Sequence, residues 1–259
     1  MNNWIELDLF GMGCGLGLIL LSLGLASWQR LGITWKIGVA TGQSIIQLLV
    51  LGYILELVFA LQNPVIVLLA IIGMIAISAI VTRNKIGNRV PYLLPIVGIS
   101  LVISTALTLT YTHLLILRVQ PWYTPQYLIP LAGVLLGNAM NAAVIAGERF
   151  ISNVNQNQTA IETHLSLGAT PRQSTQAYRQ EAIRASLFPT LNSMMVIGIV
   201  TFPGFFAGQM VAGMDPLNAS LYQMLVMFIL VITTLITTSL LIQGIDRQLF
   251  TSAAQFKSF

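Results

Sequence analysis

Charge is scarce in this sequence. Only 8% of its 259 residues are Asp, Glu, Lys or Arg, whereas 56% are hydrophobic, and the mean hydropathy is +0.82. A soluble domain carries about 25% charged residues, because its surface must be covered by groups that water solvates. The composition therefore excludes a soluble enzyme, a nucleic-acid-binding domain and a disordered chain, and it predicts a membrane protein.

Other residue types are equally scarce. The single cysteine, Cys14, rules out a disulfide within the chain and a cysteine-based metal cluster. The sequence has no G-x-x-x-x-G-K-[ST] motif, so we expect no ATPase activity and no cofactor bound by this chain. The two histidines, His113 and His164, fall on opposite sides of the predicted membrane, which argues against a histidine-rich zinc site. No metal-ligand set is visible, and we expect the chain not to be an enzyme.

Long apolar runs make up most of the rest. A helix needs about 20 apolar residues to cross the hydrocarbon core of a bilayer, and seven stretches meet this requirement. We predict an all-α polytopic membrane protein, a single transmembrane domain over residues 1–259, with a long cytoplasmic helical hairpin at about 148–185. The predicted spans are residues 7–27, 37–59, 65–82, 92–117, 126–147, 187–211 and 218–245.

The basic residues predict the orientation of these spans. Eleven of the twelve Lys and Arg residues lie in the C-terminus or in the segments that join spans one to two, three to four and five to six. The opposite side holds only Arg118. Since basic loops stay on the cytoplasmic side, we expect a multi-pass protein of the cell membrane, inner or plasma, with its N-terminus outside and its C-terminus in the cytoplasm.

The segment between the fifth and sixth spans is the most informative part of the chain. Its apolar residues follow a helical spacing of 4, 7 and 4 residues, and Gly168 is expected to end this helix as its C-cap. Thr170, Pro171 and Gln173 then form a capping-box pattern at the start of a second helix. The helices would meet at a tight corner, which either lies on lipid headgroups or docks a soluble partner. The apolar residues are Phe150, Val154, Ile161 and Leu165.

Several motifs in this segment and beyond it resemble one family. Glu162 and Gly168 have the E-x-x-x-x-x-G spacing of the coupling loop of ABC-transporter permeases. A proline closes that motif, and Pro189 resembles it but lies further from Gly168 than the motif's proline does. The string LSLGATP at 165–171 resembles the FetB-like permeases, a family associated with iron export and, in plants, with aluminium tolerance. Similar blocks cover nearly the whole chain: SIIQL at 44–48, GNAM at 137–140, IRASLFPT at 183–190 and the segment 203–223.

The resemblance implies the permease subunit of an ABC transporter, exporting a metal ion such as iron. It implies as partners a second copy of this chain and two copies of an ATP-binding cassette subunit, which would hold the ATP and Mg. The corner would then seat in a groove of the ATPase. The expected docking residues are Glu162, Leu165, Leu167, Gly168, Ala169, Thr170, Pro171 and Arg172.

Polar and methionine residues within the spans are candidates for the translocation path. Each of them could instead pack between helices. Broken helices often border a transport path, which favours the Pro203-Gly204 region, and Glu56, His113 and Asp215 could attract cations at the outer face. The path candidates are Gln43, Gln47, Glu56, Asn138, Met140, Asn141, Asn192, Met194, Thr201 and Pro203.

Three other functions stay open on the sequence. A self-contained secondary carrier or channel for a small solute would transport without a partner. A permease for a non-metal substrate, such as a sugar nucleotide, would share the same architecture. A membrane scaffold or receptor would not transport at all.

Overall fold

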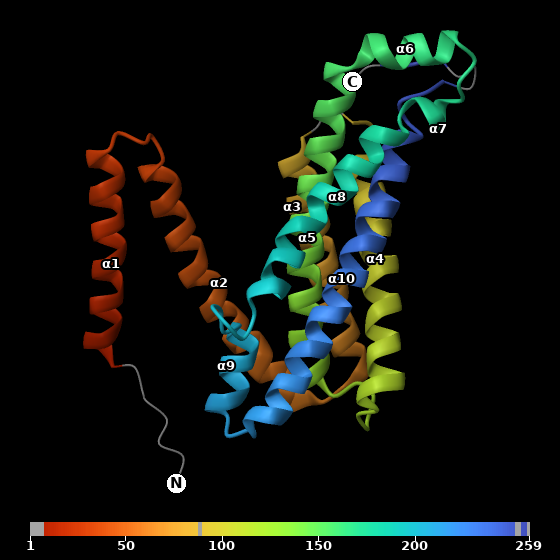
Figure 1. Cartoon of the computed structure of the whole chain (residues 1–259). Helices are drawn as coiled ribbons and strands as arrows, with labels where there is room; N and C mark the ends of the chain where they lie inside the picture. Colours follow the sequence, from red (N-terminus) through yellow and green to blue (C-terminus); the bar gives the residue numbers. More distant parts are fainter. Residues whose placement is uncertain (1–7, 88–89, 252–254, 258–259) are drawn as a thin grey trace. The chain divides into compact units, whose positions relative to one another are not determined.

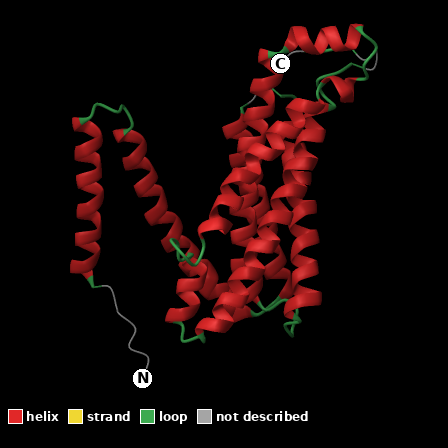
Figure 2. Cartoon of the chain, in the orientation of Figure 1, coloured by secondary structure: helices red, strands yellow, loops and turns green. Residues whose placement is uncertain are grey.

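The computed structural model describes residues 8–87, 90–251 and 255–257, and helices account for most of them (Figures 1 and 2). Within these ranges there is no β-strand, and six helices are long and apolar enough to cross a membrane. The prediction of an all-α polytopic membrane fold is confirmed.

The chain divides into two compact units, Met1–Leu61 and Gln62–Phe259. The first contains α1 (Leu9–Trp28) and α2 (Thr34–Leu61), joined by a turn in which Gly32 has a φ of +67°. The Asp8 carboxylate caps α1 by accepting a hydrogen bond of 2.8 Å from the Gly11 N–H. Most described side chains of both helices are exposed and apolar, so lipid or protein must cover them. The single domain predicted over residues 1–259 stays a prediction.

The second unit is a helical bundle with α5 and α10 at its centre (Figure 1). Helix α5 packs on α3, α8 and α10, and α10 also packs on α4. Proline occupies the first turn of α3, α5 and α10, where its fixed φ favours the helix. The long helices of the bundle are α3 (Pro64–Ile86), α4 (Leu93–Tyr111), α5 (Pro125–Gln156), α8 (Gln176–Val196) and α10 (Pro216–Asp246).

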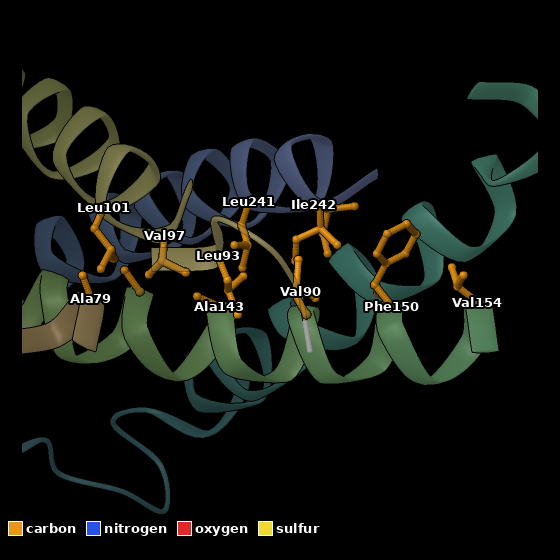
Figure 3. Packing of buried hydrophobic residues seen from close by; sticks show 14 of the residues in the cluster. Ala79, Val90, Leu93, Val97, Leu101, Ala143, Phe150, Val154, Leu241 and Ile242 are labelled. Carbon is orange, nitrogen blue, oxygen red and sulfur yellow. The ribbon is translucent and has the colours of Figure 1, made fainter. Parts of the chain in front are cut away.

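The predicted apolar stripe forms part of the bundle core (Figure 3). Phe150, Val154 and Ile161 are at most 1% exposed, and Leu165 packs against the same cluster. As the stripe predicts, α5 continues as a helix beyond the predicted span 126–147, to Gln156, and α6 (Gln158–Ser166) follows after a break at Asn157. This continuous core fixes α6 to the bundle.

The predicted sixth span is not one helix. Helix α8 runs through Pro189 to Val196, the chain is then non-helical from Ile197 to Pro203, and α9 (Gly204–Val211) follows. The break expected near Pro203 is confirmed, but it begins earlier, where Gly198 has a φ of +78°. Neither α8 nor α9 is among the six helices that qualify as spans, so a seventh crossing would have to be made by this broken segment.

Two other elements differ from the expectation. The helix predicted to start at Pro171 is divided, because α7 (Pro171–Ser174) ends at Thr175 and α8 begins at Gln176. The predicted fourth span, 92–117, ends in a π-helical turn, η1 (Thr112–Leu117). Both breaks lie next to polar side chains that are buried, which a local apolar pattern does not reveal.

A close approach between α3 and α5 predicts a strong effect at Gly147. A Cβ atom there would lie 2.6 Å from Cδ1 and 3.0 Å from Cγ1 of Ile86, whereas a Cβ at Gly137 on the same helix meets nothing within 4 Å. We expect Gly147→Val to destabilise the protein by about 1–3 kcal/mol through overpacking, measured as a lower melting temperature in detergent. Gly137→Val is the matched control, and an equal loss in both variants would contradict the packing argument.

Candidate functional site

A rigid turn joins α6 to α7 at one end of the bundle, and we call residues 167–171 the Gly168 corner (Figure 1). Gly168 has a φ of +90°, a conformation that L side chains rarely adopt. The Gly168 N–H donates to the Leu165 carbonyl and the Ala169 N–H donates to the His164 carbonyl, each at 3.0 Å. This pair of bonds is a Schellman motif, so the predicted C-cap is confirmed.

The start of α7 is capped on the other side of the turn. The Thr170 N–H donates to Oε1 of Gln173 at 2.9 Å, and the Gln173 N–H donates to Oγ1 of Thr170 at 3.4 Å. The predicted capping box is therefore confirmed, with Pro171 at the first helical position. Because both sides of the turn satisfy their own backbone groups, the Gly168 corner has a defined shape without any partner.

The Gly168 corner presents an unusual surface. The Leu167 side chain is 80% exposed at the turn, although nothing in the capping bonds requires an apolar residue there. Glu162, Thr170 and Arg172 are also exposed, and Ala169 and Pro171 are half-buried. Leu165 differs from the other predicted docking residues because it packs inward against the core.

Polar contacts attach α8, the long helix that follows the corner, to the rest of the bundle. The Asn153 amide donates to Oε2 of Glu181 at 3.0 Å, and the Arg149 guanidinium donates from Nε to Oε1 at 3.0 Å, which connects α5 to α8. Asp246 at the end of α10 accepts a hydrogen bond of 2.7 Å from Oγ1 of Thr175 and lies 3.6 Å from the guanidinium of Arg179.

Asp246 is the centre of the more protected of these two networks. Its side chain is 11% exposed and that of Arg179 is 14% exposed, whereas Arg149 and Glu181 are about half exposed. Arg172 also lies close enough to attract the Asp246 carboxylate. Thr175, Arg179 and Asp246 were missed by sequence reasoning because about 70 residues separate the partners along the chain.

Asn138 is the path candidate with the most specific contacts. Its Nδ2 donates to Oγ1 of Thr234 on α10 at 2.7 Å and lies 3.2 Å from Oγ1 of Thr190 on α8. Both threonines are buried. The Asn138 node, defined by these three residues, therefore ties α5, α8 and α10 together within the bundle.

A ladder of hydroxyl groups lies between α4 and α10. Oγ1 of Thr233 lies 3.1 Å from Oγ1 of Thr108, and Oγ1 of Thr237 lies 2.7 Å from Oγ of Ser104. The signal for it is in the sequence, because Ser or Thr recurs every four residues along one face of α4. The buried hydroxyl residues are Ser100, Ser104, Thr105, Thr108, Thr233, Thr234, Thr237 and Thr238.

A cavity of about 410 Å³ lies between α8, the break that follows it, α9 and α10. Its volume is in the usual range for small-molecule sites, about 300–1,000 Å³. Gln223 is only 6% exposed, and its Oε1 has no hydrogen-bond partner. Sequence reasoning found Met194 and Pro203 but missed Gln223 and Met227. The lining residues include Met194, Phe202, Pro203, Gln223, Met224 and Met227.

The cavity and the Asn138 node occupy successive levels of the same α8–α10 interface. Thr190 precedes Met194 by four residues on α8, which is about 6 Å along a helix. Met227 precedes Thr234 by seven residues on α10, about 10 Å. The cavity and the Asn138 node are therefore neighbouring features of one helix interface, with methionine side chains between them.

The remaining path candidates are not gathered at one site. Asn141, Asn192 and Thr201 are exposed, and Met140 is half-buried. Gln43, Gln47 and Glu56 are exposed on α2, in the first unit.

The described residues hold no group of three or more His, Cys, Asp or Glu side chains that could bind a metal ion. The Asp215 carboxylate is occupied in capping α10, where its Oδ2 accepts from the N–H groups of Leu217 and Asn218. His113 lies in a different cavity, between α3 and α4.

Comparison with known proteins gives the family. Residues 9–250 match the family described as an uncharacterised protein family, UPF0014. A UPF0014 membrane protein of Synechocystis is 47% identical over 251 residues, which cover 97% of each chain. ALUMINUM SENSITIVE 3 of Arabidopsis thaliana is 32% identical over 88% of this chain and 84% of its own.

A third relative carries a functional name. The "Probable iron export permease protein FetB" of Escherichia coli is 30% identical over 227 residues, covering 88% of this chain and 86% of its own. The resemblance to the FetB-like permeases is confirmed. No solved structure matches the chain. By the extent of these matches, this multi-pass membrane protein belongs to the UPF0014 family.

Proposed function

We propose that the chain is the permease subunit of an ABC transporter that exports a metal ion such as iron. ATP hydrolysis in a separate nucleotide-binding subunit would drive it. Two copies of the chain and two copies of that subunit would form the transporter, in the cell membrane and with the Gly168 corner in the cytoplasm. Iron as the cargo is taken from the name of the Escherichia coli relative.

The Gly168 corner is the observation that carries this proposal. Leu167 is 80% exposed on a doubly capped turn, and an apolar side chain placed there suits insertion into a groove of a partner. The turn is shaped in advance, so docking would not have to order it. The hydrogen bonds of Asp246 and those between α5 and α8 would then transmit a movement of the corner to the helices of the bundle.

The Asn138 node and the cavity beside it are the proposed translocation path. Closure of the ATPase pair would move the helices between inward-open and outward-open arrangements, a rigid-body transition. Thioether and amide groups bind Fe(II) less well than carboxylates do. Weak binding suits a path, because a cargo must leave its site as readily as it enters.

Co-purification with the ATPase tests the proposal. Gly168→Val forces a β-branched residue into a positive φ, at a cost of about 1–2 kcal/mol, and should distort the corner. We expect the native chain to retain a co-expressed P-loop ATPase encoded beside it, and the variant to lose it together with ATP-dependent iron transport in proteoliposomes.

Gly213→Val is the matched control. Gly213 also has a positive φ, +89°, and open space around it, but it lies in the turn between α9 and α10. Equal retention of the ATPase by the native chain and both variants would contradict docking at the corner. Transport by the chain alone, driven by an ion gradient, would instead identify a secondary carrier.

A further inference from the structure

A buried histidine without partners lies where α4 ends. His113 is 4% exposed, and among the described residues neither Nδ1 nor Nε2 has a hydrogen-bond partner. The backbone of Trp122 approaches the ring without completing a hydrogen bond. Leaving a buried polar group unsatisfied is costly, and π-helical turns such as η1 occur frequently at functional sites. His113 is therefore a candidate contact for a ligand.

His113 lies where two cavities meet. The inner cavity, about 580 Å³, is almost entirely apolar and is lined by side chains of α3 and α4, among them Ile72, Val102 and Leu109. The mouth cavity, about 490 Å³, is more polar and includes Arg118 and Gln120. Three residues line both cavities: His113, Leu114 and Trp122.

Arg118 gives the mouth cavity a positive charge. It is the one basic residue that the charge pattern assigns to its side of the membrane. Its side chain is exposed, its Nε donates to the Leu115 carbonyl at 3.3 Å, and no carboxylate within the described residues pairs with it. The guanidinium therefore keeps four N–H groups for an anion.

We propose that these two cavities bind one anionic phospholipid of the surrounding membrane. The phosphate would contact Arg118 and accept a hydrogen bond from His113, and one acyl chain would fill the inner cavity. An apolar chamber behind a cationic mouth matches an amphiphile, whereas a soluble anion would leave the chamber empty. The site is separate from the Asn138 node and from the Gly168 corner, so it does not depend on the proposed transport function.

Native mass spectrometry of the detergent-purified, delipidated chain tests the proposal. Phosphatidylglycerol, phosphatidylcholine and inorganic phosphate are the three probes. We expect phosphatidylglycerol to bind in preference to phosphatidylcholine, and millimolar inorganic phosphate not to displace it. Displacement by phosphate would show that only the headgroup is recognised and would overturn the proposal.

Two pairs of variants distinguish recognition of the lipid headgroup from recognition of its acyl chain. Arg118→Gln should weaken phosphatidylglycerol binding about tenfold, because a charge-assisted contact is lost, while Arg184→Gln on an exposed part of α8 should not. Ala106→Trp fills the inner cavity and should weaken both lipids, while Ile99→Trp on an exposed face of α4 should not. Unchanged binding in either Arg118→Gln or Ala106→Trp would overturn the proposal. Arg118→Lys keeps the positive charge and should keep the preference for phosphatidylglycerol over phosphatidylcholine.

Discussion

A chain carrying Leu167→Asp is expected to fold as the native chain does and to bind the proposed ATP-binding subunit about 100-fold more weakly. The residue is 80% exposed, so the new carboxylate is solvated in the free chain and leaves its stability unchanged. In the docked state the same carboxylate would lose its water without gaining a partner, which costs several kcal/mol. Titration of the ATPase against the reconstituted chain measures the dissociation constant directly.

Ala160→Asp is the control for this variant. Ala160 is exposed on α6, away from the turn, and receives the same charge. We expect less than a threefold change in the dissociation constant. If Leu167→Asp bound the ATPase as tightly as Ala160→Asp does, the exposed leucine would have no part in docking.

The Asp246→Ala variant is expected to lose about 3 kcal/mol of stability, since it leaves the largely buried Arg179 guanidinium without its partner. At about 2–4 °C per kcal/mol for a chain of this size, the melting temperature in detergent should fall by about 6–12 °C. The variant should also lose ATPase binding, because Thr175 and Arg179 hold the helix that follows the corner.

A second substitution distinguishes an unpaired charge from a lost contact. Asp246→Ala combined with Arg179→Leu should recover most of the melting temperature, because replacing both members of a buried ion pair is often nearly neutral. Arg149→Ala removes the half-exposed ion pair with Glu181 and should change stability by less than about 1 kcal/mol. A double variant as unstable as Asp246→Ala alone would contradict the charge argument.

Local features of the fold were predictable from the sequence. The long apolar runs, the prolines that begin α3, α5 and α10, and the two caps around Gly168 depend on residues within a few positions of each other. Prolines alone do not predict where the sixth span is interrupted. Pro203 ends the non-helical segment from Ile197, whereas Pro189 lies inside a continuous α8. Packing against α5 and α10 evidently outweighs the hydrogen bond that Pro189 removes.

The candidate site was predictable as a set of residue types and not as a set of contacts. Asn138 was identified because an amide inside an apolar span needs a partner, but nothing near it in sequence indicates Thr190 and Thr234, which are 52 and 96 residues away. Gln223 falls in the segment 203–223 that resembles the FetB-like permeases, but no local pattern shows that its side chain is buried. Its side chain lines the cavity together with residues of the broken segment, which are about 20 residues away in sequence.

The hydroxyl ladder between α4 and α10 has a consequence for movement. Oγ1 of Thr108 lies 2.7 Å from the Ser104 carbonyl, and Oγ1 of Thr233 and of Thr237 lie 2.6 and 2.8 Å from the carbonyls of Ile229 and Thr233. Because a hydroxyl has one proton, Thr233 and Thr237 donate either along α10 or across to α4, and the two bonds alternate. If α4 slid along α10, the bonds between the two helices would break, but the backbone carbonyls would still accept from these hydroxyls. A change of register at this interface would therefore leave no hydroxyl of the ladder without a hydrogen-bond partner, which lowers the cost of such a movement.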